Sequence, residues 1–294
     1  MEKSFMQMVK FLTILFCILF SASAFGQDYS QLDPKPYDPA TEPNIDMFIS
    51  SWKQSMPRHT HGNLIERDIF TPCIGDPMKP VVPGAVITGI KRFSHAMLEP
   101  GQMTTPFINK DEQEIFYFDS GKGIIKSGNT TQEIGTGFGA LIPPAVEYTI
   151  TNTGTEPLGM YLMIEPIRPG FTPRKDILVR DEAKLPVQGT TGHWVHISKR
   201  LFQKSDGLSV LYGMSPVWFS PMTMGQPHSH GPLFVEEIWF ALDGDINILL
   251  GKQLRKLPVG SAYKIPPDGK TPHSNINVSG DKTIKMFWLM KTTE

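Results

Sequence analysis

The chain has 294 residues, a formal net charge of −1 and 19% charged residues. This balance gives no basic surplus for binding nucleic acid and no acidic run typical of a disordered tail. Glycine and proline number 26 each, which favours a chain rich in turns, and the length allows two modest domains or one large one.

Residues 1–26 are predicted to be an export signal. Two lysines precede the apolar run FLTILFCILF, and the small residues of SASAFG follow it. Because this run is too short to span a bilayer comfortably, we expect a cleaved signal peptide and a periplasmic or secreted protein without a membrane anchor. Cleavage removes Cys17 and leaves Cys73 as the only cysteine, which excludes an intrachain disulfide.

Residues 27–80 are predicted to form a proline-rich N-terminal arm. Apolar residues at helical spacing in IDMFISSWKQSM predict one short helix there. The segment RHTHG, residues 58–62, has two histidines two positions apart, but no strand with a closing glycine follows it. We expect a surface loop, with a position over the mouth of a β domain as the alternative.

After residue 80, short apolar stretches alternate with glycine and proline, which is typical of an all-β chain. We predict one β domain at 81–168 and a second at 193–294, with a linker at 169–192 between them.

The two predicted domains contain an internal repeat. EIFYFDSG begins at Glu114, and EIWFALDG begins at Glu237, which is 123 residues later. The same offset relates three further landmarks in the two copies, namely Gly121 and Gly244, Gly137 and Gly260, and Pro143-Pro144 and Pro266-Pro267. Four landmarks at one offset indicate a duplication, so the two domains are predicted to be homologous.

The second copy carries a predicted metal site. His228 and His230 lie two apart, so on a strand both imidazoles face one side. Glu237 begins the next predicted strand, and His273 follows the second proline pair. Three imidazoles and one carboxylate suit one divalent transition metal (Mn, Fe, Ni, Co or Zn) better than Ca or Mg. The alternative for these four residues is a set of scattered surface polar groups.

These motifs resemble those of the cupin superfamily. The first motif comprises a glycine, a histidine pair, a glutamate and a second glycine, which are Gly225, His228, His230, Glu237 and Gly244. The second comprises glycine, proline, glycine, histidine and asparagine, which are Gly260, Pro266, Gly269, His273 and Asn277. Compared with the family pattern, the first glycine is closer to His228, and the loops before Glu237 and His273 are longer.

The resemblance covers about residues 81–294 and implies a bicupin. Its expected fold is all-β, with two tandem cupin-type jelly-roll barrels and an N-terminal arm. In each barrel of this kind the metal lies inside the wider mouth. A homodimer is also compatible with this architecture.

The first copy departs from the metal-binding pattern. Counting back from Glu114 puts Thr105 and Phe107 at the positions of the histidine pair, and Tyr148 stands in place of His273. A lone carboxylate and a threonine hold a transition metal poorly, so the first barrel is expected to be metal-free. In the second copy, the register of the repeat selects Glu237 as the ligand and leaves Glu236 in solvent.

Four further residues are candidates for a substrate pocket, namely Trp239, Trp288, Asn277 and Met224. Core packing is the alternative role for the aromatic and methionine side chains among them. Two classes of function remain. One is a metal-dependent enzyme of the dioxygenase, decarboxylase or sugar isomerase or lyase type, acting on a small organic or carbohydrate substrate. The other is a non-catalytic ligand-binding or storage-type bicupin with a structural metal.

Overall fold

The structure is a computed structural model that describes residues 37–188, 196–231 and 234–292. The predicted signal peptide lies outside these ranges. Within them, no helix is long and apolar enough to cross a membrane.

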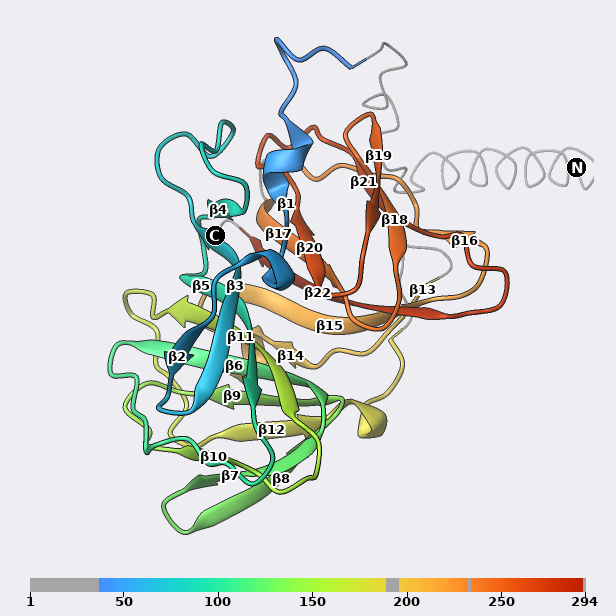
Figure 1. Ribbon diagram of the computed structural model, residues 1–294. Helices are drawn as coiled ribbons and strands as arrows, with labels where there is room; N and C mark the ends of the chain where they lie inside the picture. Colours follow the sequence, from blue (N-terminus) through green and yellow to red (C-terminus); the bar gives the residue numbers. More distant parts are fainter. Residues whose placement is uncertain (1–36, 189–195, 232–233, 293–294) are drawn as a thin grey trace, which may run out of the picture. The chain divides into compact units, whose positions relative to one another are not determined.

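The first barrel is built from two sheets (Figure 1). The larger has the strand order β12-β9-β6-β11-β5-β3-β2, with β4 beside β3, and the smaller has the order β10-β7-β8. Their strands are β2 (Arg58–Thr60), β3 (Leu64–Pro72), β4 (Ala85–Ile87), β5 (Arg92–Leu98), β6 (Glu112–Ser120), β7 (Lys122–Ser127), β8 (Thr130–Gly135), β9 (Phe138–Ile142), β10 (Thr149–Asn152), β11 (Leu158–Pro166) and β12 (Leu178–Asp181).

The second barrel repeats this plan. Its larger sheet has the order β1-β20-β17-β22-β15-β13, with β14 also beside β15, and its smaller sheet has the order β16-β21-β18-β19. The strands are β1 (Ile49–Ser51), β13 (His196–Ser198), β14 (Phe202–Gln203), β15 (Leu211–Phe219), β16 (Thr223–Met224), β17 (Phe234–Ala241), β18 (Ile246–Leu250), β19 (Gln253–Leu257), β20 (Ser261–Lys264), β21 (His273–Asn277) and β22 (Ile284–Thr292). The predicted all-β fold with two tandem barrels is therefore confirmed.

Burial along the strands explains why the larger sheets form the centre of the molecule. On β18, Ile246, Ile248 and Leu250 are buried and alternate with partly exposed residues, because one face meets the barrel interior and the other meets water. On β11, by contrast, eight consecutive residues are buried. Both faces of that strand are covered, one by its own barrel and one by the second barrel.

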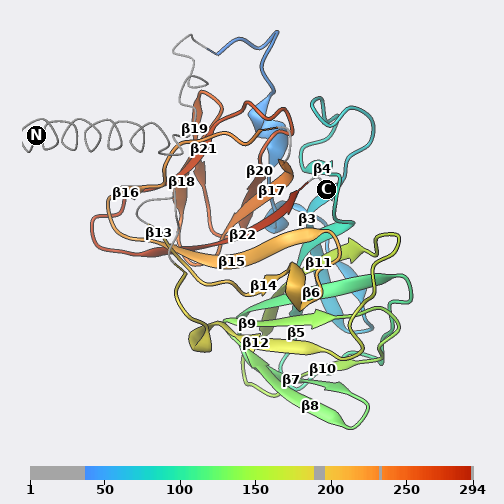
Figure 2. The same cartoon turned by 180° about the vertical axis from the view of Figure 1, so that it is seen from behind.

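In each barrel, a segment outside the repeat supplies an edge strand of the larger sheet. β1, from the predicted arm, pairs with β20 of the second barrel, and β12, from the predicted linker, pairs with β9 of the first. The view from behind shows β12 beside β9 (Figure 2). The predicted domain boundaries stay predictions, but arm and linker both supply strands to the sheets.

The short helix predicted in the arm is wrong in type. Residues Ile45–Phe48 and Trp52–Gln54 form two single-turn 3₁₀ helices, η2 and η3, and β1 lies between them. The three residues of β1 pair with β20 and take extended backbone there. Tertiary pairing therefore overrides the helical spacing of the apolar side chains. The linker adds a third such helix, η4 (Glu182–Lys184), and η5 (Lys204–Asp206) follows β14.

Aromatic rings fill the junction between the two larger sheets. Phe240 of the second barrel lies 4.9 Å from Phe93 and 4.4 Å from Tyr161 of the first, measured between ring centroids. Phe287 lies 4.5 Å from Tyr117. These distances are typical of favourable ring packing, so the barrels share a continuous apolar interface.

A buried carboxylate crosses this junction from the first barrel. Glu165, at the end of β11, is fully buried and accepts hydrogen bonds from the backbone N–H groups of Ser209, Val210 and Leu211, at 2.7, 2.9 and 3.0 Å. Burial raises the pKa of Glu165, and the three backbone donors oppose that rise. Two of these donors directly precede β15 and the third is its first residue, so the carboxylate fixes one barrel against the other.

A second carboxylate makes the reciprocal crossing. Glu236 of β17 is 1% exposed and accepts from the backbone N–H groups of Thr88, Gly89 and Ile90, at 2.6, 3.1 and 3.1 Å. The expectation that Glu236 lies in solvent is therefore wrong. Strand alternation does turn it away from Glu237, but that face of the sheet meets the first barrel instead of water.

Removing the Glu236 carboxylate should destabilise the protein strongly. We expect Glu236→Ala to lower the free energy of unfolding by about 3–5 kcal/mol, because three buried N–H groups lose their acceptor. Urea denaturation followed by tryptophan fluorescence measures this. The control is Glu133→Ala, at an exposed position on β8, for which we expect a change within about 0.5 kcal/mol. Equal effects of the two substitutions would contradict a role for the junction.

Candidate metal centre

The three predicted histidine ligands meet at one place in the second barrel. The candidate ligand nitrogens of His228, His230 and His273 all lie within 4.8 Å of one another. Backbone pairing contributes to this, because the N–H of His228 donates to the carbonyl of His273 at 3.2 Å, and the reverse bond is 2.9 Å. The segment before β17 is thus attached to the start of β21.

The fourth predicted ligand, Glu237, lies against the same cluster. Its Oε2 contacts Nε2 of His230, and its Oε1 is 3.5 Å from Nε2 of His273. Two indole N–H groups hold the carboxylate in place, because Trp239 Nε1 and Trp288 Nε1 donate to Oε1 at 2.6 and 2.9 Å. Groups that orient a metal ligand in this way tune its position and basicity.

The tautomer of His228 is set by its neighbour. Nδ1 of His228 lies 2.8 Å from the carbonyl oxygen of Gln226, and a carbonyl can only accept, so Nδ1 carries the hydrogen. The lone pair is then on Nε2. This arrangement is usual for a histidine that binds a metal through the other nitrogen.

The donor set fits a transition metal. His273 is 1% exposed, yet neither of its ring nitrogens has a hydrogen-bond partner among the described residues. A small cavity of about 10 Å³, lined by His230 and Glu237 together with Ile265, Pro266, Gly269 and Thr271, adjoins the cluster. That is space for a single small species. Unsatisfied buried imidazole beside a one-atom space is the arrangement that a metal would complete.

The electrostatics of the cluster favour deprotonated ligands at two of the three histidines. Burial lowers the pKa of His228 to about 3, and it also lowers that of His273. Burial would lower the pKa of His230 too, but the Glu237 carboxylate outweighs this and raises it. Burial alone would raise the pKa of Glu237, but His230 and His273 together hold it well below its usual range.

The predicted substrate-pocket residues lie in different settings. Trp239 and Trp288 contact the Glu237 carboxylate directly. The side-chain amide of Asn277 donates to the carbonyls of Phe219, Ser220 and Lys282, so it organises a turn. Met224 is exposed on β16, which pairs with β21. A role in substrate binding stays a prediction for all four.

The first barrel has the corresponding strands with different side chains. Phe107 and Tyr148 form the same isolated backbone bridge that His228 and His273 form in the second barrel. Phe107 is therefore the structural counterpart of His228, and counting along the repeat misplaced this position by two residues. The loop before Glu237 is longer than that before Glu114, which explains the error.

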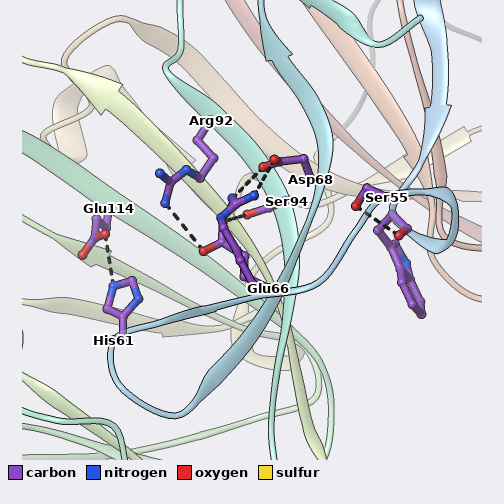
Figure 3. Close-up of polar contacts among 9 residues, drawn as sticks. Ser55, His61, Glu66, Asp68, Arg92, Ser94 and Glu114 are labelled. Carbon is purple, nitrogen blue, oxygen red and sulfur yellow. Dashed lines mark hydrogen bonds and ion pairs between the residues drawn. The ribbon is translucent and has the colours of Figure 1, made fainter.

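A histidine from outside the repeat fills the corresponding space. His61 lies in the turn of the β2–β3 hairpin, and its Nε2 is 3.3 Å from Oε1 of Glu114 (Figure 3). Tyr148 donates its hydroxyl hydrogen to Oε2 of the same carboxylate at 2.6 Å. The His61 ring packs on Phe107 at 3.9 Å between centroids. The surface loop expected at residues 58–62 is therefore wrong, because His61 is 6% exposed.

The hairpin that carries His61 is anchored by a buried charge. Glu66 of β3 is fully buried and receives hydrogen bonds from Arg58 Nη2 and Ser94 Oγ, both at 2.6 Å (Figure 3). His61 itself has a φ of +49°, which is unusual for a residue other than glycine. In this strained conformation the imidazole reaches Glu114.

Comparisons with known proteins agree with this fold. A family model described as a cupin domain matches residues 94–165, in the first barrel. No curated protein gave a significant sequence match.

Three solved structures illustrate the similarity of fold. The protein YlbA of E. coli is 14% identical, with a TM-score of 0.62, and the alignment covers 90% of this chain and 97% of that one. AerE of Microcystis aeruginosa is 14% identical, with a TM-score of 0.62 and coverages of 84% and 100%. An oxalate decarboxylase of Bacillus subtilis, described with Mn(II) centres, is 12% identical, with a TM-score of 0.63 and coverages of 89% and 80%.

The fold and the site thus define a two-barrel β protein with a metal-type histidine cluster in one barrel. Residues 94–165 match a cupin-domain family model, and the fold of the whole described chain is similar to that of solved structures such as the oxalate decarboxylase. The cupin-domain match falls on the barrel that lacks the histidine pair, so it identifies the scaffold and not the metal site.

We predict that metal binding depends on the second barrel alone. His228→Ala or His273→Ala should reduce bound divalent metal from about one per chain to below about a tenth, because each substitution removes one of the four protein ligands and leaves a gap in the buried set. Elemental analysis of the purified protein measures this. His61→Ala is the matched control, since it also removes a buried histidine beside a glutamate. Loss of the metal in the His61 variant would contradict the prediction.

The uptake of metal should release about one proton per ion at pH values below the raised pKa of His230 and above the lowered pKa values of His228 and His273. His230 has the raised pKa and keeps its proton to higher pH than the other two ligands, whereas a bound metal needs its lone pair. Affinity should therefore fall about tenfold for each pH unit below the pKa of His230. Titration calorimetry with Zn²⁺ in buffers of different ionisation enthalpy counts the protons. A release of three protons would show that all three histidines start protonated.

Proposed function

We propose that the protein is an exported metal-dependent bicupin enzyme whose reaction takes place in the second barrel. His228, His230, Glu237 and His273 hold one divalent transition metal, and the substrate is a small organic or carbohydrate molecule. The reaction is of the dioxygenase, decarboxylase or sugar isomerase or lyase type. Export rests on the apolar run and small residues of the first 26 positions.

The observation that carries the proposal is the buried His273 side chain. Its Nδ1 has no hydrogen bond in the described structure, and its Nε2 has only the 3.5 Å ionic contact with Oε1 of Glu237, although unsatisfied buried polar groups are unfavourable. The other three donors converge on it from the segment before β17 and from β17 itself. A structural role without an ion would leave this destabilising arrangement uncompensated.

A metal bound there would supply Lewis-acid or oxygen-binding chemistry. The chain's own groups set the conditions for it. Trp239 and Trp288 orient Glu237 through their N–H groups, and the Gln226 carbonyl fixes the ring of His228. Burial excludes water from the ligands, which strengthens every electrostatic interaction within the site.

The similar structures do not identify the reaction. One of them is named an oxalate decarboxylase and is described with Mn(II) centres, but at 12% identity the similarity shows the fold alone. The second candidate function is a non-catalytic binder with a structural metal. The deep burial of the histidine cluster is the observation that favours it, since His228 and Glu237 are 8% and 4% exposed.

The decisive experiment starts from protein purified from its natural source, with elemental analysis of its metal. Oxygen consumption, carbon dioxide release and sugar isomerisation are then followed with phenolic, dicarboxylate and carbohydrate substrates. We expect turnover that is lost in His228→Ala. If a native ligand binds equally well to the wild type and to the metal-free His228→Ala variant, the protein is a binder instead.

The indole N–H of Trp288 should matter for catalysis. We expect Trp288→Phe to lower metal affinity or turnover by about tenfold, because the Glu237 carboxylate loses one of its two donors. Trp218→Phe is the matched control. That indole lies on the other face of β15 and packs against Lys199 and Lys285. Elemental analysis of both variants measures metal affinity, and a rate assay measures turnover. Equal losses in Trp288→Phe and Trp218→Phe would contradict a role for the Trp288 N–H.

A further inference from the structure

A polar pocket lies beside β14 and β15 of the second barrel. It has a volume of about 440 Å³, and its lining comprises Gln188, Arg200, Gln203, Lys204, Ser205 and Tyr212. Two of these side chains are cationic, and the others offer amide or hydroxyl groups. No carboxylate is among the described residues that line it, so the pocket has the charge that attracts an anion.

Arg200 is the side chain that distinguishes this pocket from an ordinary basic surface. Its guanidinium packs over the rings of Trp288 and Tyr212, with Cζ 5.1 and 5.6 Å from the ring centroids. Its Nη1 is buried and has no hydrogen-bond partner among the described residues. Burial lowers the pKa of Arg200, but a guanidinium stays charged at any physiological pH. A buried donor of this kind is unfavourable unless a ligand accepts from it.

The guanidinium of Arg200 lies on the same face of the larger sheet as the side chain of Glu237. Glu237 is paired with Met290, and Met290 is paired with Gly213, so all three face the same side. A side chain at Gly213 would collide with Nη1 of Arg200, which places the guanidinium beside that position. Two strand spacings separate Gly213 from Glu237, so the guanidinium is about 10 Å from the carboxylate.

Trp288 connects the two places directly. The guanidinium of Arg200 packs over its ring, and its Nε1 donates to Glu237. A ligand that reaches from the metal centre to Arg200 therefore passes along one aromatic side chain. This gives the second barrel two attachment points, one for a reacting group and one for a charge.

We propose that Arg200 binds a carboxylate of the substrate, at a distance from the group that reacts at the metal centre. This assignment rests on the proposed function and adds the substrate class to it. The planar guanidinium matches a carboxylate, with which it forms paired charge-assisted hydrogen bonds. Lys204 adds a second positive charge to the same lining.

The separation of the two points limits the length of the substrate. In oxalate the two carboxylates share one carbon–carbon bond, so one molecule cannot occupy both points. A chain of several carbons between the carboxylate and the reacting group can. The inferred substrate is therefore an organic acid with its carboxylate at the far end, and not the smallest dicarboxylate.

The test uses the series oxalate, succinate and adipate as probes, titrated into the metal-loaded full-length protein and followed by ligand-observed NMR. Adipate should bind the wild type about 10- to 100-fold more tightly than it binds Arg200→Gln, because a charged hydrogen-bonded pair is lost. Oxalate should bind both proteins equally. If the adipate affinity is the same in both, the inference is overturned.

A second variant covers the case in which Arg200→Gln does not fold. Gly213→Ala keeps the arginine but displaces its guanidinium, and the position has an ordinary backbone φ. It should weaken adipate in the same way and leave oxalate unchanged. Arg255→Gln, a charge paired with Asp46 at an exposed site, is the matched control and should leave both probes unchanged. An equal loss of adipate affinity in Arg255→Gln would show that the effect comes from net charge alone and would overturn the inference.

Hexanoate separates this inference from the proposed function. Its single carboxylate needs only Arg200, so it should bind the metal-free protein and be weakened in Arg200→Gln. That result stands even if the protein takes up no metal, in which case the proposed function alone fails. If the metal is bound but hexanoate is insensitive to the substitution, the carboxylate assignment fails and the proposed function survives.

Discussion

The alternation of Glu236 and Glu237 on β17 is the constraint on which the rest of the molecule depends. Adjacent residues on a strand face opposite sides. Glu236 therefore accepts three backbone N–H groups from the first barrel, while Glu237 faces the histidines of the second. A shift of one residue would exchange the two carboxylates and destroy both arrangements at once. Two buried charges thus fix the register of the strand more firmly than apolar packing alone would.

Much of the fold follows from the sequence because turn residues and a repeat are visible there. The shared offset between Glu114 and Glu237 indicated two similar domains, and the spacing of His228, His230 and His273 indicated the metal cluster. These signals are local, or they are repeated. The same alternation argument could not show what covers the second face of β17, so Glu236 was expected in solvent and lies in a protein interface instead.

His61 shows where sequence reasoning ends. It lies outside the repeat, so no comparison of the two copies can align it with a ligand position. The available signals were the HxH pattern itself and the adjacent Gly62, which has a φ of +79° and permits the tight hairpin. Only the folded chain shows that the hairpin delivers an imidazole to Glu114. Arg200 is similar, because its relation to Glu237 passes through two strand pairings and one tryptophan.

The edge strands that come from outside the repeat affect whether the two copies can be separated. β1 comes from before the first barrel and completes the sheet of the second, whereas β12 follows the first barrel and completes its sheet. A gene fragment that encodes only one copy of the repeat would leave an open sheet edge, and open edges promote aggregation. Separating the two copies would therefore expose the edge of β20, which β1 covers. The two copies therefore keep one scaffold although Phe107 and Tyr148 stand in the first barrel where His228 and His273 stand in the second.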